Sequence, residues 1–191
     1  QTRSSQQRDA GGNIVLEVGC GTGALTEVVL NRLMRRPNGE RSRLLNYFLA
    51  TDKSTAMIER AKKRLTENTH LEFEQLTAFG SPGEKCNRWK FHLICGSLVL
   101  HDIIRDTPSL DGLIMVLKQC ATLLREKGII VFADSFVRGD GDYDRNSKYW
   151  YSWMKSAGLS DEEVTSFMSN NQDMLRTATE DQMKKAAEAS G

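Results

Sequence analysis

The sequence contains no long hydrophobic run, no low-complexity tract and no internal repeat, and these absences exclude several classes of protein. No apolar segment approaches the roughly 20 residues that a membrane-spanning helix needs. Residues 1–8 are polar and lack the apolar core of a secretory signal peptide. The composition, with 39% hydrophobic and 27% charged residues in 191, is that of an ordinary globular protein.

The sequence also has little net charge and no organised set of cysteines. Its formal net charge is only +1, so bulk electrostatics do not favour a polyanionic partner such as nucleic acid. The four cysteines, Cys20, Cys86, Cys95 and Cys120, show neither a disulfide framework nor a zinc spacing. His92 lies between two of them, but an odd offset in a strand points side chains to opposite faces, so we predict no metal site. These features favour a reducing, cytoplasmic environment.

Short apolar runs alternate with amphipathic segments along most of the chain. Residues 1–12 are expected to form a flexible lead-in, and residues 13–191 a single domain that is helical from about residue 145. Strands are predicted at 14–18, 46–50, 71–76, 91–99 and 129–132, and helices at 24–35, after 54 and at 113–124. This alternation predicts a doubly wound α/β fold with a mostly parallel sheet.

A glycine-rich turn follows the first predicted strand. Gly19, Gly21 and Gly23 stand at alternate positions, with Glu17 just before them and a helical pattern just after them. Glycine tolerates positive φ and has no Cβ to keep a ligand away from the backbone. In an open α/β sheet, a strand, a glycine turn and a helix form the usual site for a nucleotide-like ligand.

An acidic residue ends the second predicted strand. Asp52 lies farther along the chain than the roughly 20 residues expected between the glycine turn and the acid of a dinucleotide site. Ser54 is placed to cap the following helix, on which Met57 takes an inward position. The spacing therefore argues against a nicotinamide-dependent oxidoreductase.

Three segments together resemble the class I S-adenosylmethionine-dependent methyltransferases. They are Leu16-Glu-Val-Gly-Cys-Gly-Thr-Gly23, Ala50-Thr-Asp52 and Leu123-Leu-Arg-Glu-Lys-Gly-Ile-Ile-Val-Phe132. The resemblance covers about residues 13–135. It implies a Rossmann-like methyltransferase fold, S-adenosylmethionine as cofactor, and methyl transfer to a small-molecule acceptor at oxygen, nitrogen or carbon.

The resemblance assigns roles to the residues of the glycine turn and the second strand. Gly19, Gly21 and Gly23 would line the groove for the methionine half of the cofactor. Asp52 would accept hydrogen bonds from the two ribose hydroxyls, and Glu17 would orient the loop or reach the amino group.

Further cofactor contacts are implied at Lys53, Met57, Thr77, Ala78 and Gly96. Met57 would pack on the adenine, and Gly96 would lie beside the cofactor. Thr77 stands where many members of the family carry an acid for the adenine amino group. This departure keeps a non-catalytic, cofactor-binding subunit open as an alternative.

His101 is the best candidate for a base that removes a proton from the acceptor. The alternative is that His101 begins a helix or only packs there. Trp150 and Trp153 are predicted to pack in the core, whereas no fixed packing is predicted for Tyr149 and Tyr151. These aromatic residues could also wall an acceptor pocket.

Other interpretations remain open. The tail faintly resembles the enzyme that makes carboxy-S-adenosylmethionine. The basic segment 35–43 is the only sequence feature that suggests a nucleic-acid substrate. Folds of this family normally have further strands after the fifth, so we expect the last strands to be missing from this sequence. We expect a truncated chain, a domain fragment, or an exposed sheet edge that a second copy or partner chain covers.

Overall fold

Five parallel strands form the sheet at the centre of the fold. The computed structural model describes residues 12–34, 44–65, 68–76, 83–106, 110–134, 142–170 and 179–190. The strands are β1 (Asn13–Val18), β2 (Leu45–Asp52), β3 (Leu71–Gln75), β4 (Phe91–Ser97) and β5 (Leu124–Ala133). They lie in the order β3-β2-β1-β4-β5, and each neighbouring pair is parallel. The predicted fold class is confirmed, with the five strands close to their predicted positions.

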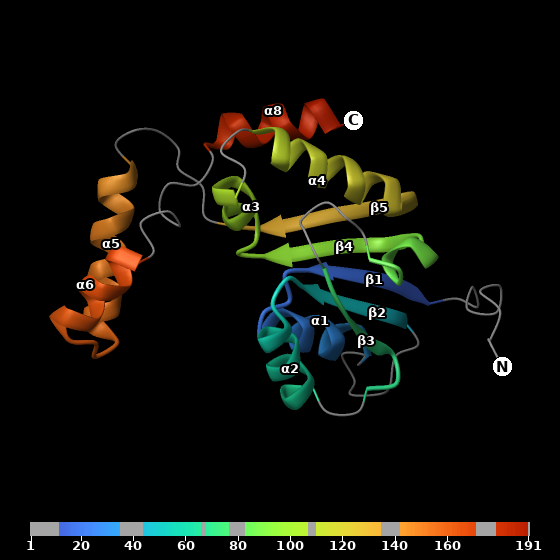
Figure 1. The fold of residues 1–191 in the computed structure, drawn as a ribbon, viewed down its shortest axis with the longest axis horizontal. Helices are drawn as coiled ribbons and strands as arrows, with labels where there is room; N and C mark the ends of the chain where they lie inside the picture. Colours follow the sequence, from blue (N-terminus) through green and yellow to red (C-terminus); the bar gives the residue numbers. More distant parts are fainter. Residues whose placement is uncertain are drawn as a thin grey trace.

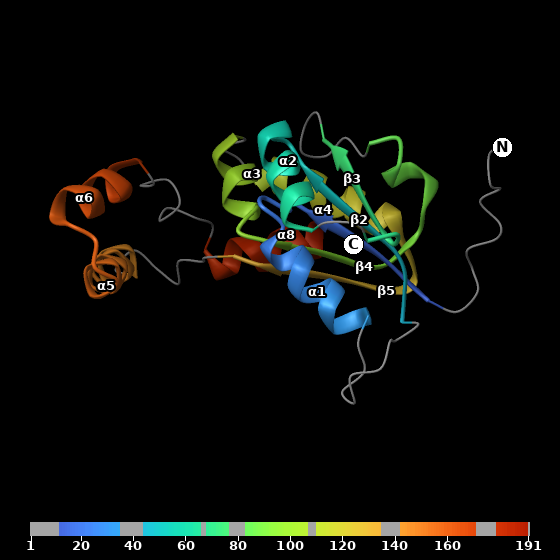
Figure 2. The same cartoon turned by 90° about the horizontal axis from the view of Figure 1, so that it is seen from below.

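Helices cover both faces of this sheet (Figures 1 and 2). α1 (Ala24–Met34) and α2 (Thr55–Arg64) pack on one face, where Leu30 and Ala61 meet Phe48 of β2. α3 (Leu100–Asp106), α4 (Leu110–Leu123) and α8 (Glu180–Ser190) pack on the other face, where Leu113 and Ala186 are fully buried. α3 was not predicted, because its seven residues follow β4 too closely to show a separate apolar period.

Side-chain caps fix several helix starts, including the one that the sequence predicts at Ser54. The Ser54 hydroxyl accepts a hydrogen bond from the Met57 amide at the start of α2. Ser160 and Glu163 form a reciprocal capping box before α6 (Asp161–Asn170), and Thr179 and Gln182 form another before α8. A short 3-10 helix at Cys86–Arg88 precedes β4.

The connection into β5 differs from the sequence-based expectation. The predicted strand begins at residue 129, whereas α4 ends at Leu123 and β5 already begins at Leu124, so that Gly128 lies within the strand. Lys127, just before it, has a positive φ. A Cβ on Gly128 would lie 2.8 Å from the Phe91 carbonyl oxygen, so glycine is needed there for close approach of the backbones.

α5 (Asp142–Ser156) and α6 form a hairpin that stands away from the sheet, beyond the carboxyl ends of β4 and β5 (Figures 1 and 2). Met154 and Val164 are buried in it. Trp153 is 53% exposed, so the expectation that it packs in the core is wrong; it instead meets the edge of Trp150. No helix among the described residues is long and apolar enough to cross a membrane.

Candidate functional site

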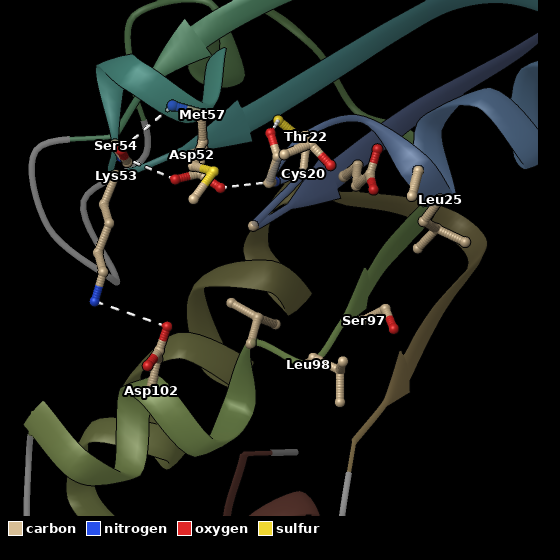
Figure 3. A pocket seen from close by; sticks show the side chains of 15 residues that line it. Cys20, Thr22, Leu25, Asp52, Lys53, Ser54, Met57, Ser97, Leu98 and Asp102 are labelled. Carbon is tan, nitrogen blue, oxygen red and sulfur yellow. Dashed lines mark hydrogen bonds and ion pairs between the residues drawn. The ribbon is translucent and has the colours of Figure 1, made fainter. Parts of the chain in front are cut away.

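A cavity of about 440 Å³ opens at the carboxyl ends of β1, β2 and β4 (Figure 3). Its size is within the range of small-molecule sites in proteins. The predicted residues that line it are Glu17, Gly19, Gly21, Asp52, Lys53 and Met57. They come from the end of β1, the glycine loop, the end of β2 and the first turn of α2, which meet because parallel strands end at one edge of the sheet.

The three glycines of the loop all have positive φ, but a Cβ would meet different surroundings at each of them. A Cβ on Gly19 would lie 2.7 Å from a methyl group of Val99, so Gly19 lets the loop pack against the connection between β4 and α3. A Cβ on Gly23 would lie 2.9 Å from Leu65, so Gly23 lets α1 approach α2. A Cβ on Gly21 would meet nothing within 4 Å, which leaves its backbone open to a ligand.

Glu17 is a buried carboxyl group behind this loop. Only 1% of the residue is exposed, and its Oε2 accepts a hydrogen bond of 2.5 Å from the Thr26 hydroxyl in α1. Burial raises the pKa of Glu17 to about 7; the Thr26 hydrogen bond opposes this rise, and the charge of Asp52 adds to it. Near neutral pH, Glu17 therefore exists in both protonation states.

Asp52 holds the loop through its carboxylate. One oxygen accepts a 2.8 Å hydrogen bond from the Gly21 amide, and the other accepts a 2.8 Å hydrogen bond from the Ser54 amide. A carboxylate oxygen has more than one acceptor position, so Asp52 can still accept hydrogen bonds from a ligand. Across the cavity, the Lys53 ammonium lies 3.9 Å from the Asp102 carboxylate (Figure 3).

Three predicted site residues do not line the cavity. Gly23 packs between helices, and Gly96 lies beneath the Phe132 ring, where a Cβ would come within 2.7 Å of it. His101 is buried in the first turn of α3. Thr77, Ala78 and the basic segment 35–43 lie outside the described residues.

His101 belongs to a polar cluster with two carboxylates. Its Nδ1 lies 3.0 Å from Oδ1 of Asp134, and Oδ2 of Asp134 accepts hydrogen bonds from the Leu100 and His101 amides. Its Nε2 lies 3.8 Å from Oδ1 of Asp102, which does line the cavity. Neither aspartate was predicted. Asp134 comes directly after the β5 strand, and this position at the functional edge of the sheet is the signal that could have revealed it.

Comparison with known proteins identifies similar sequences and structures. The profile of a family described as "Methyltransferase domain" matches residues 16–130. The trans-methyltransferase CalH, solved in complex with SAH, is 27% identical over 63% of this chain and 31% of its own, with a TM-score of 0.50. No curated protein matches the chain.

Two further structures share the fold at lower identity. A candidate methyltransferase from Bacillus halodurans C-125 is 14% identical over 95% of this chain and 63% of its own, with a TM-score of 0.62. A Haloferax volcanii candidate methyltransferase, solved with the methyltransferase activator Trm112, is 11% identical over 95% of this chain and 62% of its own, with a TM-score of 0.60. The chain thus spans less than two thirds of the length of each of these structures.

Proposed function

Because the chain belongs to the methyltransferase-domain family, in the class that uses S-adenosylmethionine, we propose that it transfers a methyl group to a small-molecule acceptor. The observation that carries this proposal is the cavity at the carboxyl ends of β1 and β2, where the open backbone of Gly21 faces the acceptor oxygens of Asp52. The structure of CalH with SAH supports the same cofactor here.

The residues of the cavity fit this cofactor in charge as well as in shape. Among the described residues, its wall carries the carboxyl groups of Glu17, Asp52 and Asp102 and the ammonium group of Lys53. This excess of acidic groups suits a ligand with a cationic sulfonium and a cationic amine. The open position at Gly21 leaves room for the ligand at the backbone itself.

In the proposed reaction, S-adenosylmethionine supplies an electrophilic methyl group in an in-line displacement. The residues of the chain position both reactants and exclude water, and these two effects can supply most of the acceleration. We assign the ribose hydroxyls to Asp52, the amino group to Glu17 and the adenine to Met57, with Lys53 beside them. Thr77 and Ala78 remain predicted adenine contacts. We propose that His101 takes up the proton of the acceptor by way of Asp102, which lines the cavity.

Calorimetric titration with S-adenosylmethionine and S-adenosylhomocysteine tests the proposal. We expect the unsubstituted chain to bind both, and Asp52→Ala to bind at least 100-fold more weakly, because it loses the ribose contacts and two loop hydrogen bonds at about 1–3 kcal/mol each. Asp181→Asn on α8 is the control for a lost negative charge. Absence of binding by the unsubstituted chain refutes the proposal.

The mass of the bound cofactor separates two alternative functions. A carboxy-S-adenosylmethionine synthase would carry a cofactor heavier by a carboxylate group. A non-catalytic subunit would bind the cofactor weakly and leave it unchanged with every acceptor.

We also infer that a second copy or a partner chain covers the outer edge of β5. Among the residues that the structure describes, this strand is the last of the sheet, and its Ile129 and Val131 side chains are 57% and 51% exposed. Exposed edge strands offer unpaired backbone groups to other chains. Light scattering after size exclusion tests this inference, with Val131→Lys as the variant expected to weaken association. If the chain is a monomer at all concentrations, a second copy of the chain does not cover this edge.

A further inference from the structure

The cavity has a second wall, none of whose side chains is assigned to a particular group of the cofactor. Leu98, Val99 and Asp102 line it from the connection between β4 and α3. Leu98 has a φ of +55°, which is strained for a residue with a side chain, and that side chain is 53% exposed at the cavity (Figure 3). Residues held in sparsely populated backbone conformations cluster at active sites and ligand sites.

A buried cluster stands behind Asp102. The Asp134 side chain is 1% exposed, and its oxygens bind the Leu100 amide and His101 Nδ1. The same contacts fix the start of α3 against the end of β5, so the imidazole and Asp102 keep a constant position beside the cavity. His101 Nε2 is 3.8 Å from Asp102 Oδ1, which is too long for a hydrogen bond but within the range of an ion pair.

We propose that Asp102 recognises the acceptor, and that the acceptor carries a hydroxyl or amine group next to an apolar body. Leu98 contacts the apolar body, and Asp102 accepts a hydrogen bond from the O–H or N–H group. His101 receives the proton from Asp102, and Asp134 acts as a positioning residue for His101. This inference rests on the proposed methyl transfer and adds the chemical class of the acceptor.

The proton balance follows from this arrangement. The acceptor oxygen or nitrogen forms its new bond to the methyl carbon with its own electron pair, and the pair of the broken carbon–sulfur bond stays on sulfur. The proton of the acceptor passes to an Asp102 carboxylate oxygen. A proton that moves on to His101 Nε2 lies between the Asp102 and Asp134 carboxylates, whose charges stabilise it.

Binding of small probes to the chain saturated with S-adenosylhomocysteine tests the inference. Calorimetry would use benzylamine, benzyl alcohol and benzoate, each with an apolar ring. We expect the amine, the alcohol or both to bind, and to bind at least tenfold more weakly to Asp102→Asn, with Asp181→Asn unchanged. Amine binding alone assigns amine acceptors, and alcohol binding alone assigns hydroxyl acceptors.

A spectroscopic measurement separates recognition from a merely structural role. In ¹⁵N-histidine spectra, binding of the probe should shift His101 but not His70 or His92, and Asp134→Asn should shift the His101 Nδ1 signal. The inference is overturned if neither the amine nor the alcohol binds, if Asp102→Asn binds them equally, or if benzoate binds best. Failure to bind S-adenosylhomocysteine at all would instead refute the proposed function, and this inference with it.

Discussion

The two walls of the cavity are built in different ways. One, which we call the loop wall, consists of residues 17–23 and Asp52, and backbone hydrogen bonds within or next to the loop fix its side chains. The other, the α3 wall, consists of residues 97–102 and depends on Asp134, which lies more than 30 residues farther along the chain. Both walls join segments that lie more than 30 residues apart in the chain. They differ because the loop wall is built from a glycine pattern and a strand-end acid that the sequence shows, whereas the α3 wall depends on one aspartate that no pattern marks.

This difference between the walls matches a difference between binding a shared cofactor and choosing an acceptor. The loop wall offers bare backbone and carboxylate oxygens, which suit a ligand that a whole family shares. The α3 wall offers a leucine, an aspartate and a supported histidine, which can differ between members without disturbing the fold. We therefore place cofactor binding on the first wall and acceptor choice on the second.

The largest expected effect comes from Gly19, where the two walls touch. Gly19→Ala forces a side chain into a positive φ and against Val99, with a Cβ only 2.7 Å from its methyl group. The strain and the overpacking together should lower the free energy of unfolding by about 2–5 kcal/mol. Urea unfolding measures this loss.

Gly21→Ala is the matched control, because Gly21 has a similar φ but open space at its Cβ position. It should cost about 1–2 kcal/mol from the backbone conformation alone, yet weaken cofactor binding more than its small stability loss suggests. Equal losses of stability in the two variants would show that the contact between the walls contributes nothing.

The next effect concerns the pH dependence of the loop wall. Burial raises the pKa of Glu17 from 4.5 to about 7, so the folded chain holds a proton that the unfolded chain has released between these values. The stabilisation from protonated Glu17 is therefore complete below pH 4.5. The free energy of unfolding falls by about 3 kcal/mol as the pH rises from 4.5 to about 7.

Glu17→Gln removes this titration but keeps an acceptor for the Thr26 hydroxyl. The variant should therefore be more stable than the unsubstituted chain at pH 8, with the difference disappearing toward pH 4.5. Urea unfolding at several pH values gives both curves. Parallel curves would contradict a raised pKa at Glu17.

The residues of the loop wall could be picked out from the sequence because each belongs to a short local pattern, although Asp52 lies 31 residues beyond Gly21. Glu17, the glycines and Asp52 belong to short patterns at strand ends, and a parallel sheet brings such ends together. Periodicity predicted the five strands for the same reason. It could not separate α3 from β4, because a seven-residue helix contains only about two turns.

The α3 wall and the start of β5 depend on contacts between distant residues. Nothing near His101 in the sequence indicates that Asp134 holds its imidazole. Nor does the sequence show that Gly128 lies against the Phe91 carbonyl rather than at a helix end. In both places, the register between strands decides which residues come into contact, and local sequence patterns do not specify that register.

The smallest expected effect tests whether the walls are independent. Lys53 and Asp102 form the ion pair across the cavity, at 3.9 Å and with side chains 40% and 27% exposed. A pair so long and solvated contributes about 0.5 kcal/mol or less, and salt screens it. Lys53→Gln should thus leave stability almost unchanged and alter cofactor affinity less than about threefold, because glutamine keeps most of the apolar stem.

Urea unfolding of Lys53→Gln, Asp102→Asn and the double variant yields the coupling energy. A coupling above about 1 kcal/mol would mean that the ion pair ties α3 to β2, and that acceptor choice and cofactor binding are linked through the two walls.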